Sequence, residues 1–193
     1  DNDGDPDLYF ANGSNEYPAN SKNYHDRLYI NDGKGNLEIA RQALPENFTS
    51  KGCVKAADFD RDGDEDIFVG GRVLPGKYPL PVSSFIYRNI STTGSPKFED
   101  VTERVAGPLE NIGMVCDGIW TDFDNDGWID LIVVGEWMSV TFLKNNNGKF
   151  ENVSTGSGIN DQKGWWNSIA AADLDNDGDI DYIAGNLGEN SFL

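Results

Sequence analysis

The 193-residue sequence predicts an all-β fold built from repeated four-stranded antiparallel sheets. Two observations predict it. An acidic pattern of nine residues returns four times, and each copy precedes a short run rich in β-branched and aromatic residues. Helical periodicity is scarce, and the chain holds 22 glycines. Because repeats of about 50 residues are typical of propeller blades, we expect a β-propeller.

The acidic pattern is D-x-D-x-D-G-x-x-D, and the sequence begins inside its first copy, at the third position. We therefore expect this sequence to be a piece of a longer protein. The four copies, called the acidic turns below, cover residues 1–7, 58–66, 122–130 and 173–181. Each would crowd several carboxylates into a few residues, and that self-repulsion opposes a compact state unless a cation offsets it.

Calcium is the cation that this pattern favours, because calcium takes six to eight oxygen ligands in flexible geometry. The pattern offers carboxylates at positions 1, 3, 5 and 9, a glycine at position 6 for the sharp turn, and the backbone carbonyl of position 7. Magnesium ranks second, and the lack of soft ligands disfavours zinc and copper. The predicted calcium ligands are Asp1, Asp3, Asp5, Asp7, Asp58, Asp60, Asp62, Asp64, Asp66, Asp122, Asp124, Asp126, Trp128, Asp130, Asp173, Asp175, Asp177, Asp179 and Asp181.

Other readings of the acidic turns explain the sequence less well. An EF-hand requires Glu at position 12, where this chain has Val69, Val133 or Ala184. Dockerin modules continue into a helix, whereas β-rich runs follow these turns. Asp and Gly also favour ordinary turns, but four copies with the same phasing favour a metal site.

The repeat unit is a strand, an acidic turn, a second strand, and a hairpin of two more strands. We expect thirteen strands and a single domain over residues 1–193, an incomplete arc of two full and two partial blades. The expected blades cover residues 1–48, 49–108, 109–160 and 161–193, with the first strand of the first blade and the last two of the last blade missing. An open arc exposes apolar faces, so we expect the remaining blades of the parent chain, or a partner, to cover them.

At this point the residues resemble a known family. The acidic turn followed by Ile67-Phe68-Val69-Gly70 resembles the FG-GAP or VCBS repeat, which builds the β-propellers of integrin α subunits and of many secreted bacterial proteins. The stretch from Gly113 to Leu193 is similar to bacterial relatives of cartilage acidic protein. The resemblance implies a calcium-stapled propeller, and the family includes adhesion receptors, lectins and domains attached to polysaccharide-degrading enzymes.

The formal net charge of −18 makes nucleic acid and anionic membranes poor partners. No stretch is apolar for long enough to span a bilayer. Two cysteines are too few for a disulfide framework. We predict that Cys53 and Cys116 are free, buried thiols, and a bridge between them stays the alternative.

Catalysis has weak support in the sequence. The one histidine, His25, lies in a polar insertion without a neighbouring nucleophile motif. Glu136 and Glu189 are the carboxylates outside the acidic turns and near blade ends that could serve as catalytic acids. We therefore predict a non-enzymatic chain.

Aromatic residues are the better candidates for ligand contact. We expect most of the five tryptophans to pack between blades, but one of Trp165 and Trp166 to face a ligand as a stacking platform. Tyr78 lies in the connection 72–81, which three prolines stiffen, and is a further candidate.

Together these features predict a calcium-binding extracellular or cell-surface module that recognises a protein or glycan through loops between blades, with calcium in a structural role. One alternative is a propeller domain of a polysaccharide-acting enzyme whose catalytic site lies elsewhere. The other is an architectural spacer.

Overall fold

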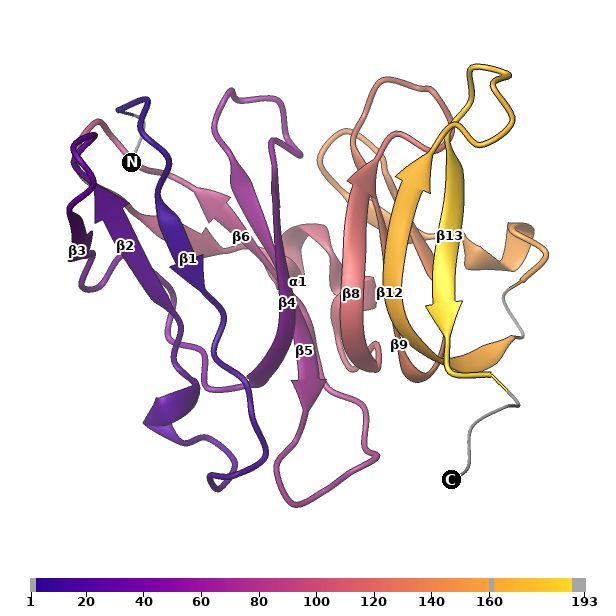
Figure 1. The fold of residues 1–193 in the computed structure, drawn as a ribbon, viewed down its shortest axis with the longest axis horizontal. Coiled ribbons are helices and arrows are strands. Elements are labelled where there is room, and N and C mark those ends of the chain that lie inside the picture. The colour runs from indigo at the N-terminus through magenta and orange to yellow at the C-terminus, as the bar shows by residue number, and fades with distance from the viewer. Residues whose placement is uncertain (1–2, 160–161, 189–193) are drawn as a thin grey trace.

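The computed structural model describes residues 3–159 and 162–188 and contains thirteen β-strands in antiparallel sheets (Figure 1). The strand count and the antiparallel pairing agree with the prediction. The first sheet consists of β1 (Leu8–Phe10), β2 (Arg27–Asn31) and β3 (Leu37–Ile39). The second sheet consists of β4 (Ser50–Ala57), β5 (Asp66–Val73), β6 (Phe85–Asn89) and β7 (Phe98–Asp100), in that order.

The third sheet consists of β8 (Met114–Thr121), β9 (Asp130–Ser139), β10 (Thr141–Asn145) and β11 (Phe150–Asn152). The last pair is β12 (Lys163–Ala172) and β13 (Asp181–Asn186). The start of β12 also pairs with the end of β9, which joins the last pair to the third sheet. The helices are short: η1 (Lys22–Tyr24), α1 (Thr102–Val105), η2 (Gly107–Leu109) and η3 (Ser154–Gly156).

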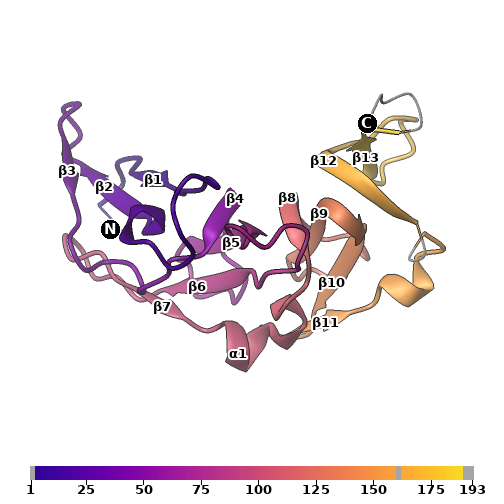
Figure 2. The same ribbon diagram turned by 90° about the horizontal axis from the view of Figure 1, so that it is seen from below.

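The sheets follow one another along an open arc (Figure 2). The strands β4, β8 and β12 lie on the concave side of the arc, and β7 and β11 lie on the convex side. The acidic turns connect β4 to β5, β8 to β9 and β12 to β13, so all three lie at the same end of the sheets. This arrangement repeats one local structure along the arc.

The hydrophobic core lies between neighbouring sheets. The largest cluster joins the second and third sheets and includes Phe68, Leu131, Val133 and Leu143, all fully buried. Smaller clusters join the first sheet to the second and the third sheet to the last pair. Strands β5 and β9 are buried on both faces, which explains their continuous apolar runs in place of an alternating pattern. Each such side chain contributes about 1.5–3 kcal/mol to stability.

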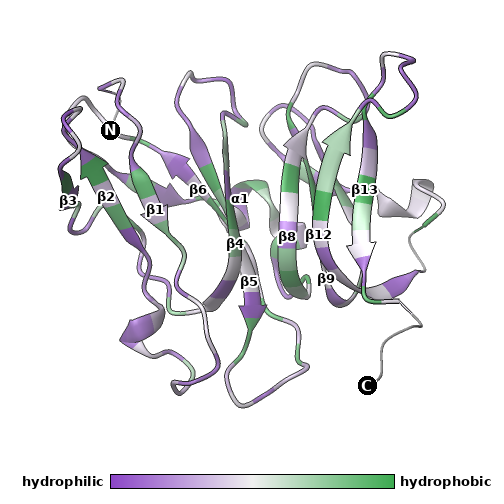
Figure 3. Ribbon diagram, viewed as in Figure 1, coloured by the Kyte–Doolittle hydropathy of each residue, from purple (hydrophilic) through white to green (hydrophobic). Residues whose placement is uncertain are grey.

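Apolar side chains remain exposed at the two ends of the arc. Leu8, Phe10 and Leu37 of the first sheet are exposed, as are Ile180 and Ile183 near β13. Figure 3 shows stretches of hydrophobic colour on several strands, among them β1, β2 and β12. Within the described residues, no helix has the length and apolar character that crossing a membrane requires.

Each concave-side strand carries a β-bulge at an equivalent position. The strand register skips Gly52 in β4, Cys116 in β8 and Asn167 in β12, each six residues before the first Asp of its turn. Cys53 and Cys116 are free thiols, as predicted, but they are half-buried, not fully buried. The bulge explains this difference for Cys116 alone, because Cys116 is itself the residue that leaves the ladder, whereas Cys53 pairs with Gly70.

Candidate metal centre in the acidic turns

Each of the three complete acidic turns bends through two left-handed residues. Position 6 is glycine in every copy, with φ of 95° at Gly63 and 88° at Gly127, which confirms the predicted need for glycine. Position 4 is also left-handed, at Arg61, Asn125 and Asn176. Asn tolerates this conformation, so an Asn at position 4 could have indicated it from the sequence, whereas an Arg at that position could not.

The carboxylate at position 1 organises the turn. The backbone N–H groups of Asp62 and Gly63 donate to Asp58 Oδ1 and Oδ2 at 3.1 and 3.0 Å. Asp126 and Gly127 donate to Asp122 in the same way, at 3.0 and 2.8 Å. The turn therefore fixes the position-1 carboxylate before any ligand binds.

The position-9 carboxylates of the second and third turns, Asp66 and Asp130, are buried, and each bridges three segments. Asp130 accepts from the N–H of Phe123, the second residue of the turn, and from the N–H of Asn145 at the end of β10, at 3.1 and 2.7 Å. Asp66 does the same with Phe59 and with Asn89 at the end of β6.

The same contact recurs in the first unit, where the Asn31 N–H donates to Asp7 Oδ1 at 2.9 Å. Sequence reasoning missed this contact, although Asn31, Asn89 and Asn145 end the third strand of their units and could have revealed it.

Burial at position 9 works against the charged form. Desolvation raises the pKa of Asp66 to about 7 and that of Asp130 to about 6. Burial also raises the pKa of Asp60. A cation beside these groups would favour their charged forms and so offset this cost.

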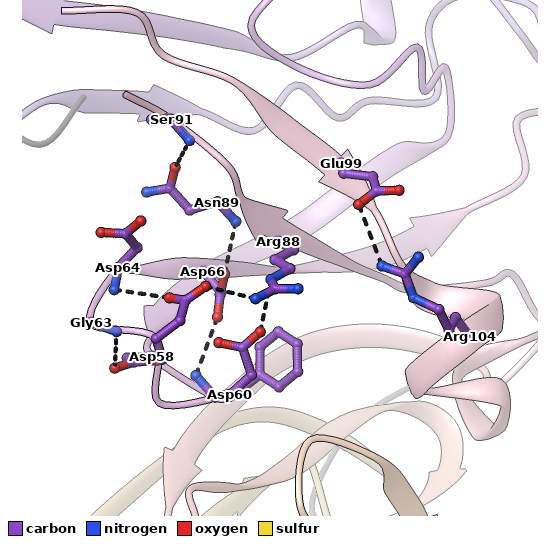
Figure 4. Close-up of polar contacts among 12 residues, drawn as sticks. Asp58, Asp60, Gly63, Asp64, Asp66, Arg88, Asn89, Ser91, Glu99 and Arg104 are labelled. Atoms are coloured by element: carbon purple, nitrogen blue, oxygen red, sulfur yellow. Dashed lines mark hydrogen bonds and ion pairs between the residues drawn. The ribbon is translucent and has the colours of Figure 1, made fainter. Parts of the chain in front are cut away.

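The turns gather their carboxylates into three clusters whose oxygens lie within 4.8 Å of one another. The clusters are Asp58, Asp60 and Asp62; Asp122, Asp124 and Asp130; and Asp173, Asp175 and Asp181. Figure 4 shows Asp58 and Asp60 of the first cluster, with Asp66 beside them. Among the residues that the structure describes, buried Asp60 Oδ1 has no hydrogen-bond partner. An all-oxygen donor set with an unpaired buried oxygen fits a hard cation such as calcium.

Two basic side chains reach into these clusters from equivalent positions. Arg88 in β6 lies 2.8 Å from both Asp60 Oδ2 and Asp62 Oδ2 (Figure 4). Lys144 in β10 contacts Asp124 and lies 3.0 Å from Asp126 Oδ2. Each therefore meets the carboxylates at positions 3 and 5, an arrangement that the sequence analysis missed.

One contact joins two neighbouring turns. The Arg61 guanidinium lies 4.0 Å from the centroid of the Trp128 ring and donates to the Gly127 carbonyl. Trp128 itself donates its backbone N–H to Asp126 Oδ1 at 2.9 Å. The second and third turns are therefore in direct contact.

The remaining predicted ligands follow the same pattern where the structure describes them. Position 7 donates its N–H to the position-5 carboxylate in each turn, as Asp5 does to Asp3, Asp64 to Asp62 and Asp179 to Asp177. Asp1 lies outside the described residues.

The candidate ligand and catalytic residues lie at the opposite end of the strands. Trp165 contacts Trp137, which bonds to Tyr78, whereas Trp166 packs against the core cluster of Ile132, Val134 and Ile169. We expected most of the five tryptophans to pack between blades, and Trp137, which is 58% exposed, is an exception.

The candidate acid Glu136 is buried and paired with Arg72. The His25 ring contacts Phe48, and Glu189 lies outside the described residues.

A family model described as FG-GAP-like repeat matches residues 1–69 and 122–184. These two segments span all four acidic turns and make up about two thirds of the chain. The chain belongs to the FG-GAP-like repeat family, as the sequence predicted. A comparison with curated proteins found no match.

Proposed function

We propose that this chain is part of an extracellular β-propeller, a calcium-binding recognition or adhesion module in which calcium is mainly structural. The observation that carries the proposal is the convergence of carboxylates in three acidic turns at one end of the arc. Family membership supports it, because FG-GAP repeats commonly bind calcium and are typical of extracellular proteins.

In this proposal the ion is held by the carboxylates of each turn and joins the strands on either side of it. The position-9 carboxylate already links the turn to the third strand of its unit through Asn89 or Asn145. When bound, calcium supplies positive charge that offsets the repulsion among these carboxylates.

The exposed apolar side chains at both ends of the arc support the view that the second and third sheets are full blades and that the first sheet and the last pair are partial ones. Further blades would cover Phe10 at one end and Ile183 at the other. We propose no catalytic role for the chain, and the pairing of buried Glu136 with Arg72 supports this view.

Thermal unfolding with and without calcium tests the proposal. Extracellular calcium sites bind at about 10⁻⁴–10⁻³ M, so 10 mM calcium should stabilise the chain by about 1.4–2.7 kcal/mol per turn relative to EDTA. Magnesium at the same concentration and ionic strength is the control and should stabilise it less. An unchanged Tm in calcium would contradict the structural role.

A further inference from the structure

Three aromatic side chains meet at the end of the strands opposite the acidic turns. Trp137 comes from β9, Trp165 from the start of β12, and Tyr78 from the connection between β5 and β6. The two indole centroids lie 5.7 Å apart with an interplanar angle of 44°, and Trp137 Nε1 donates to Tyr78 Oη at 2.7 Å. Trp137 is 58% exposed and Tyr78 49%. We call these three residues the aromatic platform.

Trp137 is the extra residue of a β-bulge. In the pairing of β9 with β12, Met138 is opposite Gly164 and Glu136 is opposite Trp165, so Trp137 has no partner in the ladder. Its φ is 56°, in the left-handed region that favours glycine. A bulky residue there costs about 1–3 kcal/mol, and its exposure means that burial offsets little of this cost. Stability therefore does not explain a tryptophan at this position, whereas a surface function does.

The platform is held in place by buried and paired groups beneath it. Glu136, next to Trp137, is 5% exposed and paired with Arg72, whose Nη1 lies 2.6 Å from Cys116 Sγ. The Trp165 N–H donates to Asn186 Oδ1, and its carbonyl accepts from Leu187, both at 3.0 Å. A surface fixed in this way loses little conformational entropy when a ligand binds.

We propose that the aromatic platform binds a carbohydrate chain of β-1,4-linked pyranose units, whose ring faces stack on Trp137 and Trp165. This proposal rests on the recognition function proposed above and names its ligand class. Equatorial substituents leave both faces of such sugars as C–H surfaces, which suit aromatic rings. The Arg72 side chain is 33% exposed and can donate to sugar hydroxyls at the edge of the platform.

Charge and shape favour a sugar over other ligands that stack. Nucleotides and nucleic acids carry phosphates, which the net charge of −18 repels. Quaternary ammonium ligands need several rings that enclose them, whereas Trp137 packs beside Trp165 and is 58% exposed. A neutral sugar chain needs only such an open surface.

Isothermal titration of the chain in 10 mM calcium with cellohexaose and with chitohexaose tests the proposal, with α-linked maltohexaose as the comparison ligand. We expect one of the β-linked hexasaccharides to bind and Trp137→Gly to weaken that binding about tenfold. Trp137→Gly should keep or raise the Tm, because glycine adopts this φ without strain. Tyr17→Ala removes another exposed aromatic ring, from a different connection, and should leave binding unchanged.

Three results would overturn the proposal that the aromatic platform binds a β-linked sugar chain. They are no binding of either β-linked hexasaccharide, binding that survives Trp137→Gly, and a Tm that falls on Trp137→Gly, which would show a packing role. Each of these results can occur while calcium still raises the Tm, so the sugar-binding proposal can be wrong while the proposed calcium-binding module is right. Failure of calcium to raise the Tm instead contradicts the calcium module, whatever the sugar titration gives.

Discussion

The two ends of the strands differ in how much the units share. At the acidic turns the second and third units make the same contacts: a position-1 carboxylate that caps the turn, and a buried position-9 carboxylate bonded to the third strand. At the opposite end the units differ. Strand β5 leads into a long connection that contains Tyr78, whereas β9 bulges at Trp137 and turns directly into β10. A shared feature is explained by the fold of each unit, and a feature found in one unit calls for a function of its own.

Removing a position-9 carboxylate should produce the largest effect. Asp130→Ala leaves the buried N–H groups of Phe123 and Asn145 without their acceptor, which costs about 2–5 kcal/mol even in EDTA. Urea unfolding at pH 7 measures this change. If the second and third units are built alike, Asp66→Ala should lower the free energy of unfolding by the same amount. Clearly unequal losses would contradict the view that the units share the same contacts at the acidic turns.

Two variants separate the structural part of this effect from the calcium part. Asp130→Asn keeps one acceptor oxygen where Asp130 uses both, so in EDTA it should lose only part of what Asp130→Ala loses, and it should gain less from calcium. Asp126→Ala removes an exposed carboxylate and should also change mainly the response to calcium. Equal losses in EDTA for Asp130→Ala and Asp130→Asn would show that the hydrogen bonds matter less than we infer.

Much of the acidic-turn end could be predicted from the sequence, because its contacts are local. The position-6 glycine, the strands on either side and the convergence of nearby carboxylates all follow from nine residues. The contacts of Asp66 with Asn89 and of Asp130 with Asn145 cross to the third strand. An alignment of the repeat units could have predicted these contacts, because Asn31, Asn89 and Asn145 occupy the same position in their units.

The opposite end could not be predicted in the same way. The exposure of Trp137 depends on the register between β9 and β12, which belong to different units and pair at only a few residues. A single extra residue in that pairing turns its side chain from the sheet into solvent. The sequence identified Trp165 and Tyr78 as candidates but gave no reason to place Trp137 between them.

A smaller effect is expected from the basic residues of the turns. Lys144→Gln removes a positive charge that contacts Asp124 and Asp126, so the third turn should bind calcium severalfold more tightly and the chain should be less stable in EDTA. Calcium titration followed by calorimetry measures the first effect. Lys149→Gln, in the hairpin turn after β10, makes the same change in net charge and is the control.

Arg88→Gln should act on the second turn as Lys144→Gln acts on the third. The first unit has Ile30 at the equivalent position, so a basic side chain meets the turn carboxylates only in the second and third of these units. A calcium affinity that stays the same or falls in Lys144→Gln would show that the lysine supports the ion and does not compete with it.

The smallest effect is expected from the contact between the second and third turns. Its size shows whether neighbouring turns are coupled or stabilise their units independently. Arg61→Ala removes the guanidinium from the Trp128 ring and from the Gly127 carbonyl. A cation–π contact at an exposed site contributes about 0.5–1 kcal/mol, which corresponds to a Tm about 1–4 °C lower for a chain of this size. Arg61→Lys keeps the charge but loses the planar stacking, so it should recover only part of the loss. If the turns are coupled, Arg61→Ala should also weaken calcium binding at the third turn, since Trp128 lies within that turn. A Tm and a calcium titration identical to the wild type would mean that each turn stabilises its own unit alone, and that the units are joined only by the core between their sheets.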